Sequence, residues 1–79
     1  MITSAQIRAA RALLDWSRGQ LSIASGVGIS ALMLLESSNG VPSGNIKTFE
    51  SVQKAFESVG IEFIGTPESG AGVRWKAKS

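Results

Sequence analysis

The sequence contains no cysteine, no histidine and no tyrosine. Without thiolates or imidazoles it offers neither a disulfide framework nor the usual ligands of a zinc or iron site, so we expect no metal and no other cofactor. The same residue types supply most nucleophiles and general bases, and only six scattered carboxylates and the lysines remain for such chemistry. We therefore expect that the protein is not an enzyme, has no catalytic residues and folds by packing alone.

Long hydrophobic runs are absent too. No apolar segment approaches the roughly 18 to 20 residues that span a bilayer. The N-terminus also lacks the basic and then apolar order of a signal peptide. We therefore expect a soluble, cytoplasmic protein that does not contact a membrane.

Charge of either sign is sparse. Eight Lys and Arg side chains against six Asp and Glu give a net charge of +2, and the sequence pI is about 9.5. This balance permits nucleic-acid binding without indicating it. A chain of 79 residues supports one core, for which a hydrophobic fraction of 43% is ample, so the sequence predicts a single domain.

Helical spacing of apolar residues appears first in residues 5–14, with Arg8 towards the outer face. Thr3 or Ser4 can cap this predicted helix, because their side-chain oxygens accept from the free N–H groups of a first turn. The helix is expected to end near Asp15.

Two short helices are expected next, over residues 18–25 and from about residue 28 to residue 37. Ser17 can cap the first, and Gly26 can close it because glycine adopts positive φ easily. Residues 38–45 collect Ser, Asn, Gly and Pro, which favour a loop.

A fourth helix is predicted over residues 46–59, with Asn45 as its cap. Its apolar stripe consists of Ile46, Phe49, Val52, Phe56 and Val59. Gly60 would end it. The segments IEFI (61–64) and VRWK (73–76) are then expected as antiparallel strands, and GTPESGAG between them as a flexible turn.

Residues 18–37 also meet the demands of a helix-turn-helix. Gly26 can turn the chain between two short helices, while Leu21, Val27, Leu32 and Leu35 point to one underlying core. The expected fold is mainly α, with four to five helices and a short C-terminal antiparallel β-hairpin; residues 1–60 would form the helix-turn-helix core and residues 61–79 the hairpin and basic tail. The predicted core contains Leu14, Leu21, Val27, Leu32, Leu35, Phe49, Val52 and Phe56.

Four segments together, IRAARALLDWSRGQL, the SGV turn, LMLLES and VPSGNIKTFESVQKAFESVGIEF, resemble the Xre family of phage Cro/repressor-type regulators over residues 2 to 64. The ending GVRWKAK is similar to short bacterial members that continue into a small β-segment. The resemblance implies a Cro/repressor-like fold that binds operator DNA as a dimer, with the third helix in the major groove. It also implies a structural ion pair between Arg11 and Glu36.

The same resemblance assigns candidate DNA contacts. The base-facing positions of the third helix are Gly28, Ile29, Ser30, Met33 and Leu34. Candidate phosphate contacts are Arg8, Arg18, Asn39, Gly40, Ser43, Asn45 and Lys47, with Arg74, Lys76 and Lys78 at the C-terminus. For Arg18 a solvated surface position is an equal alternative, and residues 39–45 can equally be a plain loop.

The third helix departs from the family pattern. Of its outward residues only Ser30 can hydrogen-bond to a base, and the helix has no positive charge. Ile29, Met33 and Leu34 would instead form a continuous apolar surface. Two functions therefore stay open: a DNA-binding transcriptional regulator, or a helix-turn-helix converted to protein binding, such as an antiactivator or antirepressor that docks into a groove on another regulatory protein. A third alternative is a domain that serves only homo-oligomer packing.

The hairpin carries a separate prediction. A two-stranded ribbon is marginal alone in water, so its apolar residues need cover and its edge needs a partner strand. We expect a homodimer whose interface contains Ile61, Phe63, Val73 and Trp75. The alternative is a monomer with a frayed tail, which Gly70 and Gly72 would favour.

Overall fold

The computed structural model describes residues 2–37 and 46–76. In chain order the elements are α1 (Ser4–Leu14), α2 (Arg18–Ser25), α3 (Ile29–Ser37), α4 (Ile46–Glu57), β1 (Ile61–Thr66) and β2 (Ser69–Trp75). The expectation of a mainly α fold with a C-terminal antiparallel hairpin is confirmed. The predicted loop at 38–45, with its candidate contacts Asn39, Gly40, Ser43 and Asn45, lies outside the described residues.

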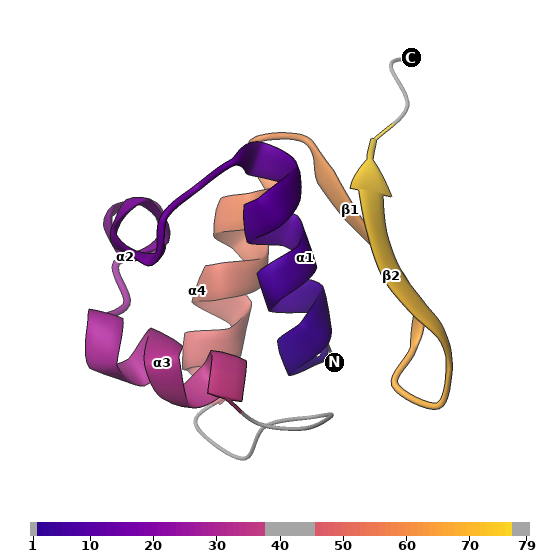
Figure 1. Ribbon diagram of the computed structural model, residues 1–79, viewed down its shortest axis with the longest axis horizontal. Coiled ribbons are helices and arrows are strands. Elements are labelled where there is room, and N and C mark those ends of the chain that lie inside the picture. Colours follow the sequence, from indigo (N-terminus) through magenta and orange to yellow (C-terminus); the bar gives the residue numbers. More distant parts are fainter. Residues whose placement is uncertain (1, 38–45, 77–79) are drawn as a thin grey trace.

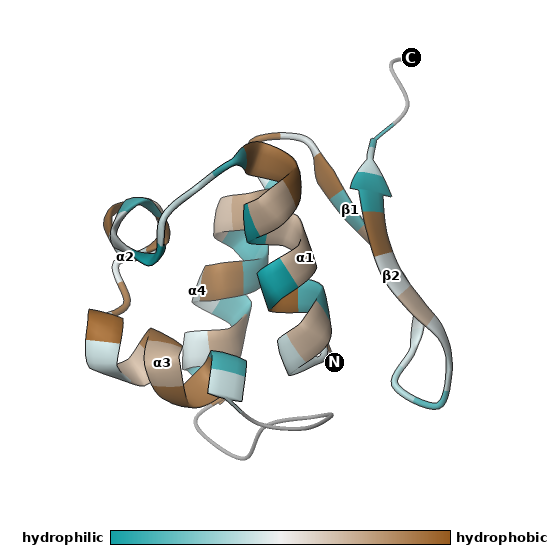
Figure 2. Ribbon diagram, viewed as in Figure 1, coloured by the Kyte–Doolittle hydropathy of each residue, from teal (hydrophilic) through white to brown (hydrophobic). Residues whose placement is uncertain are grey.

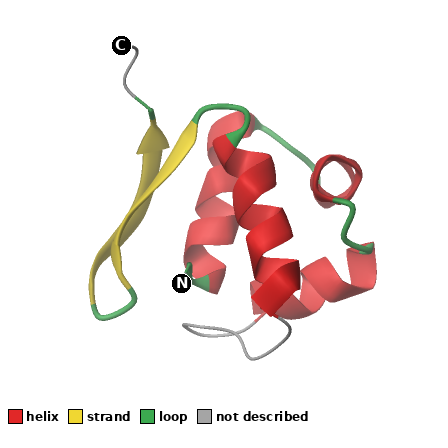
Figure 3. Ribbon diagram, turned by 180° about the vertical axis from the view of Figure 1, so that it is seen from behind, coloured by secondary structure: helices red, strands yellow, loops and turns green. Residues whose placement is uncertain are grey.

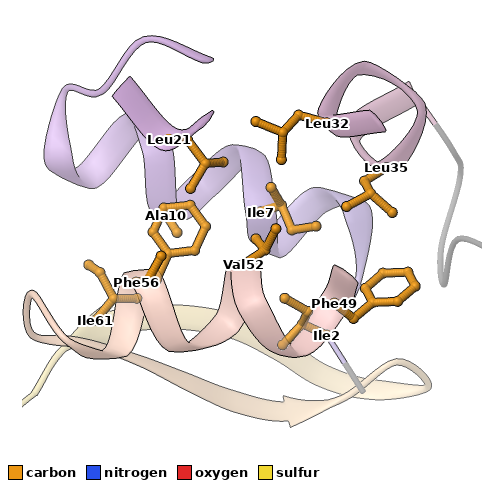
Figure 4. Packing of buried hydrophobic residues seen from close by; sticks show 11 residues of the cluster. Ile2, Ile7, Ala10, Leu21, Leu32, Leu35, Phe49, Val52, Phe56 and Ile61 are labelled. Carbon is orange, nitrogen blue, oxygen red and sulfur yellow. The ribbon is translucent and has the colours of Figure 1, made fainter. Parts of the chain in front are cut away.

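In the middle of the molecule α1 lies in front of α4 (Figure 1), and core side chains such as Ile7 and Val52 fill the space between the two helices (Figure 4). On one side they are covered by α2 and α3, and on the other side by the hairpin, an arrangement also visible from behind (Figure 3). The elements that touch include α1 with α3, α2 with α4, α1 with β2 and α4 with β1. The hairpin and the α2–α3 pair therefore occupy opposite flanks of one core.

Capping boxes start the first two helices. Thr3 accepts a hydrogen bond from the Gln6 amide, and the Gln6 side chain in turn accepts from the Thr3 amide at 2.7 Å. Ser17 and Gln20 repeat the arrangement at α2. Each box satisfies N–H groups that have no partner within the helix. The predicted caps at positions 3 and 17 are confirmed.

The turn between α2 and α3 has the geometry that a helix-turn-helix requires. Gly26 ends α2 with φ of 72°, and only residues 26–28 separate the two helices, which meet at a bend of 114°. Across residues 2–37 and 46–76 no single helix is long and apolar enough to cross a membrane; only the bent α2–α3 pair, taken together, passes that test by length and composition.

The core lies between the four helices and the hairpin (Figure 4). It is built from Ile2, Ile7, Ala10, Leu21, Leu32, Leu35, Phe49, Val52, Ala55, Phe56 and Ile61. Leu14 and Val27, which were predicted to be core residues, are only partly buried and pack against this cluster. The other six predicted core residues are buried.

The predicted bounds and stripe of the fourth helix are partly wrong. The helix ends at Glu57 rather than at residue 59, and both Ile46 and Val59 are exposed. After the helix the amides of Val59 and Gly60 bond three residues back, to Phe56 and Glu57. This tighter turn interrupts the helical spacing, so Val59 no longer continues the buried stripe.

The hairpin is longer than expected. Phe63 pairs with Val73 and Ile64 with Gly72, and the strands continue into most of the segment that was predicted as a flexible turn; only Pro67 and Glu68 form the turn. The pairing is irregular beyond Ile64, where Thr66 lies opposite both Ser69 and Gly70, and Gly65 has a φ of 76°. A Cβ at this position would lie 2.1 Å from the Gly70 carbonyl oxygen, so the close approach of the two strands depends on glycine.

Candidate functional site

The outer face of α3 is the most apolar exposed surface of a described helix. Ile29 is 49% exposed, Met33 51% and Leu34 72%. Residues three or four positions apart on a helix are neighbours, so Met33 lies beside Ile29. Met33 and Leu34 line one surface pocket together with Ser30 and Ser37, so the three apolar side chains form one patch that the two serines border. We call Ile29, Met33 and Leu34 the α3 patch. The prediction that these residues point outward is confirmed, and Gly28 and Ser30 are exposed as well.

The α3 patch has no charge of its own. Glu36 is the single ionisable residue of α3, and it is only 3% exposed. Brown, which marks hydrophobic residues, predominates along α3 in Figure 2, whereas α1 and α4 alternate more strongly between teal and brown. A ligand of this face would therefore meet methyl, methylene and thioether groups and two hydroxyls.

Glu36 holds α3 to the two preceding helices. Its Oε1 accepts from Arg11 Nη2 at 2.6 Å and Nε at 3.0 Å, and its Oε2 accepts from Arg18 Nε at 3.1 Å. Arg11 also donates to the Trp16 carbonyl, which ties the α1–α2 connection to the same cluster. The ion pair between Arg11 and Glu36 is thus present, and Arg18 makes it a triad in which two guanidiniums share one buried carboxylate.

The C-terminal end of α3 is capped from α1. The Ser4 hydroxyl donates to the Leu35 carbonyl, and Arg8 donates to the Glu36 carbonyl. The last carbonyls of a helix have no N–H donor within it, and a cation at this end also suits the helix dipole. Together with the triad, these contacts hold α3 at both its side and its end, so the α3 patch is presented on a rigid element.

Three of the candidate phosphate contacts, Arg8, Arg18 and Arg74, bond to groups within the fold. Arg8 has an exposed side chain, yet it reaches α3, and Arg18 belongs to the triad. Neither the phosphate interpretation nor the solvated-surface interpretation of Arg18 included this ion pair. Lys47 and Lys76 are exposed, and Arg74 pairs with Glu62 at 2.5 Å; Lys78 lies outside the described part of the chain. Their contacts with phosphate stay predictions.

Sequence reasoning missed the roles of Ser4, Gln6 and Arg8 at the interfaces. Gln6 donates from Nε2 to the carbonyls of Ile64 and Gly72, so one side chain joins the capping box to the hairpin. The spacing T-x-x-Q could have revealed the capping box. No local pattern could have revealed the long-range partners, because they lie 28 to 66 positions away.

The hairpin residues predicted at a dimer interface divide into two groups. Ile61 is 1% exposed and lies in the core of its own chain, so its side chain cannot face a partner; that part of the prediction is wrong, because the hairpin packs closely on α4. Phe63 and Val73 are half-buried against the same core, and Trp75 is 51% exposed.

Across the described residues, no group of three or more acidic side chains is placed to hold a metal ion. A scan against protein-family models finds no match to this chain, and a search of curated proteins finds no significant match.

Proposed function

We propose that this chain is a helix-turn-helix regulatory domain of Cro/repressor-like fold that binds another regulatory protein through the α3 patch. The observation that carries the proposal is the exposure of Ile29, Met33 and Leu34 on a helix whose inner face is already packed. These three side chains are not part of the chain's own hydrophobic core. A rigid helix with an exposed apolar face of this kind suits an apolar groove on a partner.

The energetics favour such docking. Complete burial of an exposed Ile, Leu or Met side chain is worth about 1.5 to 3 kcal/mol, so covering the exposed parts of three such side chains contributes roughly 3 to 5 kcal/mol. A few residues of this kind commonly dominate the energetics of an interface. Because the triad and the caps already order α3, little conformational entropy would be lost on binding.

The charges of the same region favour a protein partner over DNA. Neutralisation of phosphates by Lys and Arg supplies much of the affinity of DNA-binding proteins. The helix α3 has no cation, and Arg8, Arg11 and Arg18 all bond to Glu36, either at its carboxylate or at its carbonyl. The exposed face of α3 offers a base edge only the hydroxyls of Ser30 and Ser37, and that of Ser37 already donates to the Leu34 carbonyl.

Sequence-specific DNA binding is the second candidate, and the bend of 114° between α2 and α3 favours it. This geometry lets a second helix enter the major groove while the first crosses the backbone. Readout would then depend on contacts between the α3 patch and thymine methyl groups, with Ser30 as a hydrogen-bonding residue.

A salt titration distinguishes the two candidates. Fluorescence anisotropy measures the affinity for random DNA and for DNA from the promoter of the protein's own gene, because log affinity falls with log salt at about −0.9 for each phosphate neutralised. We expect a slope between zero and about −2 on both DNAs and no preference for the promoter. A slope near −5 together with a strong promoter preference would contradict the protein-binding proposal.

The double variant Met33→Arg, Leu34→Gln tests the patch itself. Arg and Gln are good helix formers and both positions are exposed, so we expect the thermal midpoint to change by no more than about 2 °C. The partner protein that the wild type captures is first identified and purified. Calorimetry should then show that the variant binds this partner at least about a hundredfold more weakly than the wild type does.

Ile46→Arg is the matched control, because Ile46 is 59% exposed at the start of α4, outside the patch. It introduces the same charge at a comparable exposed apolar position and should leave the affinity unchanged. Equal binding of wild type and double variant would rule out the patch as the interface. Unfolding of the double variant would show instead that Met33 and Leu34 support the core.

A further inference from the structure

Met33 lies in the middle of the α3 patch. It follows Ile29 by one helical turn, directly precedes Leu34 and is 51% exposed. With Leu34 and the two bordering serines it lines one surface pocket. The Met33 side chain is therefore open to solvent at the position where a partner of the α3 patch would contact it.

The chain has few side chains that react readily with peroxides. It lacks cysteine, whose thiolate is a frequent target of these oxidants, and its only methionines are Met1 and Met33. Met1 lies outside the described residues. Oxygen transfer to a thioether requires contact with the oxidant, so a buried methionine is shielded and an exposed one is not. Met33 therefore gives peroxide direct access to the α3 patch.

We propose that Met33 is a reversible oxidation site, and that its conversion to methionine sulfoxide by hydrogen peroxide prevents docking of the α3 patch. This inference rests on the proposed function and adds the regulation of the same surface. The Met33 sulfur attacks one peroxide oxygen, and the O–O bond breaks as the S–O bond forms. The sulfur is oxidised by two electrons, and the departing hydroxide takes the remaining proton and leaves as water.

The reverse step needs a dithiol as reductant. The dithiol removes the sulfoxide oxygen as water and is itself oxidised to a disulfide, which restores the thioether. Sulfoxide reductases catalyse this reduction, with a separate enzyme for each epimer of the sulfoxide. The modification of Met33 is thus a change that a reducing environment can undo.

Oxidation acts on docking because it changes the polarity of the patch. The S–O group is a strong hydrogen-bond acceptor, and it would lose its water on entering an apolar groove. Burial of a polar group without a hydrogen-bond partner is unfavourable, whereas burial of a thioether is favourable. Ile29 and Leu34, the other two side chains of the α3 patch, have no donor to offer it. A single added oxygen therefore reverses the contribution of the central residue.

The fold itself should tolerate the change. Met33 does not belong to the hydrophobic core. The position of α3 depends on other side chains, namely the ion pairs of Glu36 with Arg11 and Arg18 and the contact of Arg8 with the last turn. We therefore expect oxidation to move the thermal midpoint by no more than about 2 °C, as for other surface changes.

Peroxide treatment of the full chain, followed by tryptic peptide mapping, tests the site. Trypsin separates Met33, in residues 19–47, from Met1, in residues 1–8. We expect the Met33 sulfoxide to form in the native chain within about threefold of its rate in the urea-unfolded chain, because the side chain is already exposed. Stronger protection in the native chain would overturn the proposal, since the oxidant would not reach the sulfur.

Retention on a phenyl matrix measures the apolar surface without any partner protein. The wild type should elute earlier after peroxide treatment and return to its original position after treatment with a sulfoxide reductase and dithiothreitol. Met33→Leu is the matched control, because leucine is apolar and a good helix former but has no sulfur. Its elution should be the same before and after peroxide. An unchanged elution of the oxidised wild type would contradict the proposal.

Calorimetry with the purified partner of the α3 patch measures the effect on docking. We expect the oxidised wild type to bind at least about tenfold more weakly than the reduced protein, and Met33→Leu to be insensitive to peroxide. Equal affinity of the oxidised and reduced wild type would overturn this inference alone, provided that Met33→Arg, Leu34→Gln still weakens binding. If that double variant binds as tightly as the wild type, the proposed function fails, while peptide mapping still decides whether Met33 is oxidised.

Discussion

Replacement of Glu36 by alanine is expected to lower the free energy of unfolding by about 3 kcal/mol, because the removal of one partner leaves the others buried without compensation. Glu36 is 3% exposed and is the shared acceptor of Arg11 and Arg18. When the Glu36 carboxylate is removed, Arg11 keeps only its hydrogen bond to the Trp16 carbonyl, although its side chain is only 21% exposed. Arg18 is more exposed and can regain water, which keeps the loss below that of a fully buried triad.

Urea denaturation followed by far-UV circular dichroism measures this loss. Glu50→Ala on the exposed side of α4 is the control, and should change the free energy of unfolding by less than about 0.5 kcal/mol. Arg11→Gln should cost more than Arg18→Gln, because Arg11 is the more buried partner and makes two bonds to Oε1. A loss below about 1 kcal/mol for Glu36→Ala would mean that the triad does not hold α3 in place.

Replacement of Phe56 by alanine is expected to cost about 3 to 5 kcal/mol, the range of buried aromatic truncations. The Phe56 side chain is fully buried, and its ring lies 5.9 Å from the rings of both Trp16 and Phe63. It therefore joins the α1–α2 connection, α4 and β1 at one point. Since small domains are stable by only about 5 to 15 kcal/mol, the variant should be close to unfolding.

The fluorescence of Trp16, in the Trp75→Phe background, reports on this site directly. In Phe56→Ala we expect the urea midpoint to fall and the Trp16 emission to shift to the red before the main transition, because the ring loses its stacking partner. Ile46→Ala serves as the control, since Ile46 is exposed. An unchanged midpoint would place Phe56 outside the cooperative core.

The starts and ends of helices could be predicted where side chains within one turn determine them. Thr3 and Ser17 satisfy the first amides of α1 and α2, and Gly26 adopts the left-handed conformation that ends α2; all three features depend on residues within one turn. The end of α4 could not be predicted, because Val59 continues the helical spacing in sequence. The chain leaves the helix there to direct Ile61 into the core.

For the candidate site, the periodicity of α3 was sufficient to separate Leu32 and Leu35, which are buried, from the α3 patch. The bonds that Arg8 and Arg18 make to Glu36 could not be predicted from the sequence, because Glu36 lies 28 and 18 positions away from them. An arginine on the outer face of a helix can bind phosphate, water or a neighbouring helix. Its position in the apolar periodicity of the sequence is the same in each case, so the sequence does not identify its partner.

The sequence by itself determined the mainly α class, the caps, the glycine turn and the apolar, uncharged outer face of α3. These properties follow from interactions between residues a few positions apart and from the side chains that are present at all. The tertiary structure alone decided which arginines bond to Glu36, that Ile61 belongs to the core and where the strand pairing of the hairpin becomes irregular. These depend on contacts between distant segments, which form only when burial of one common core brings the segments together.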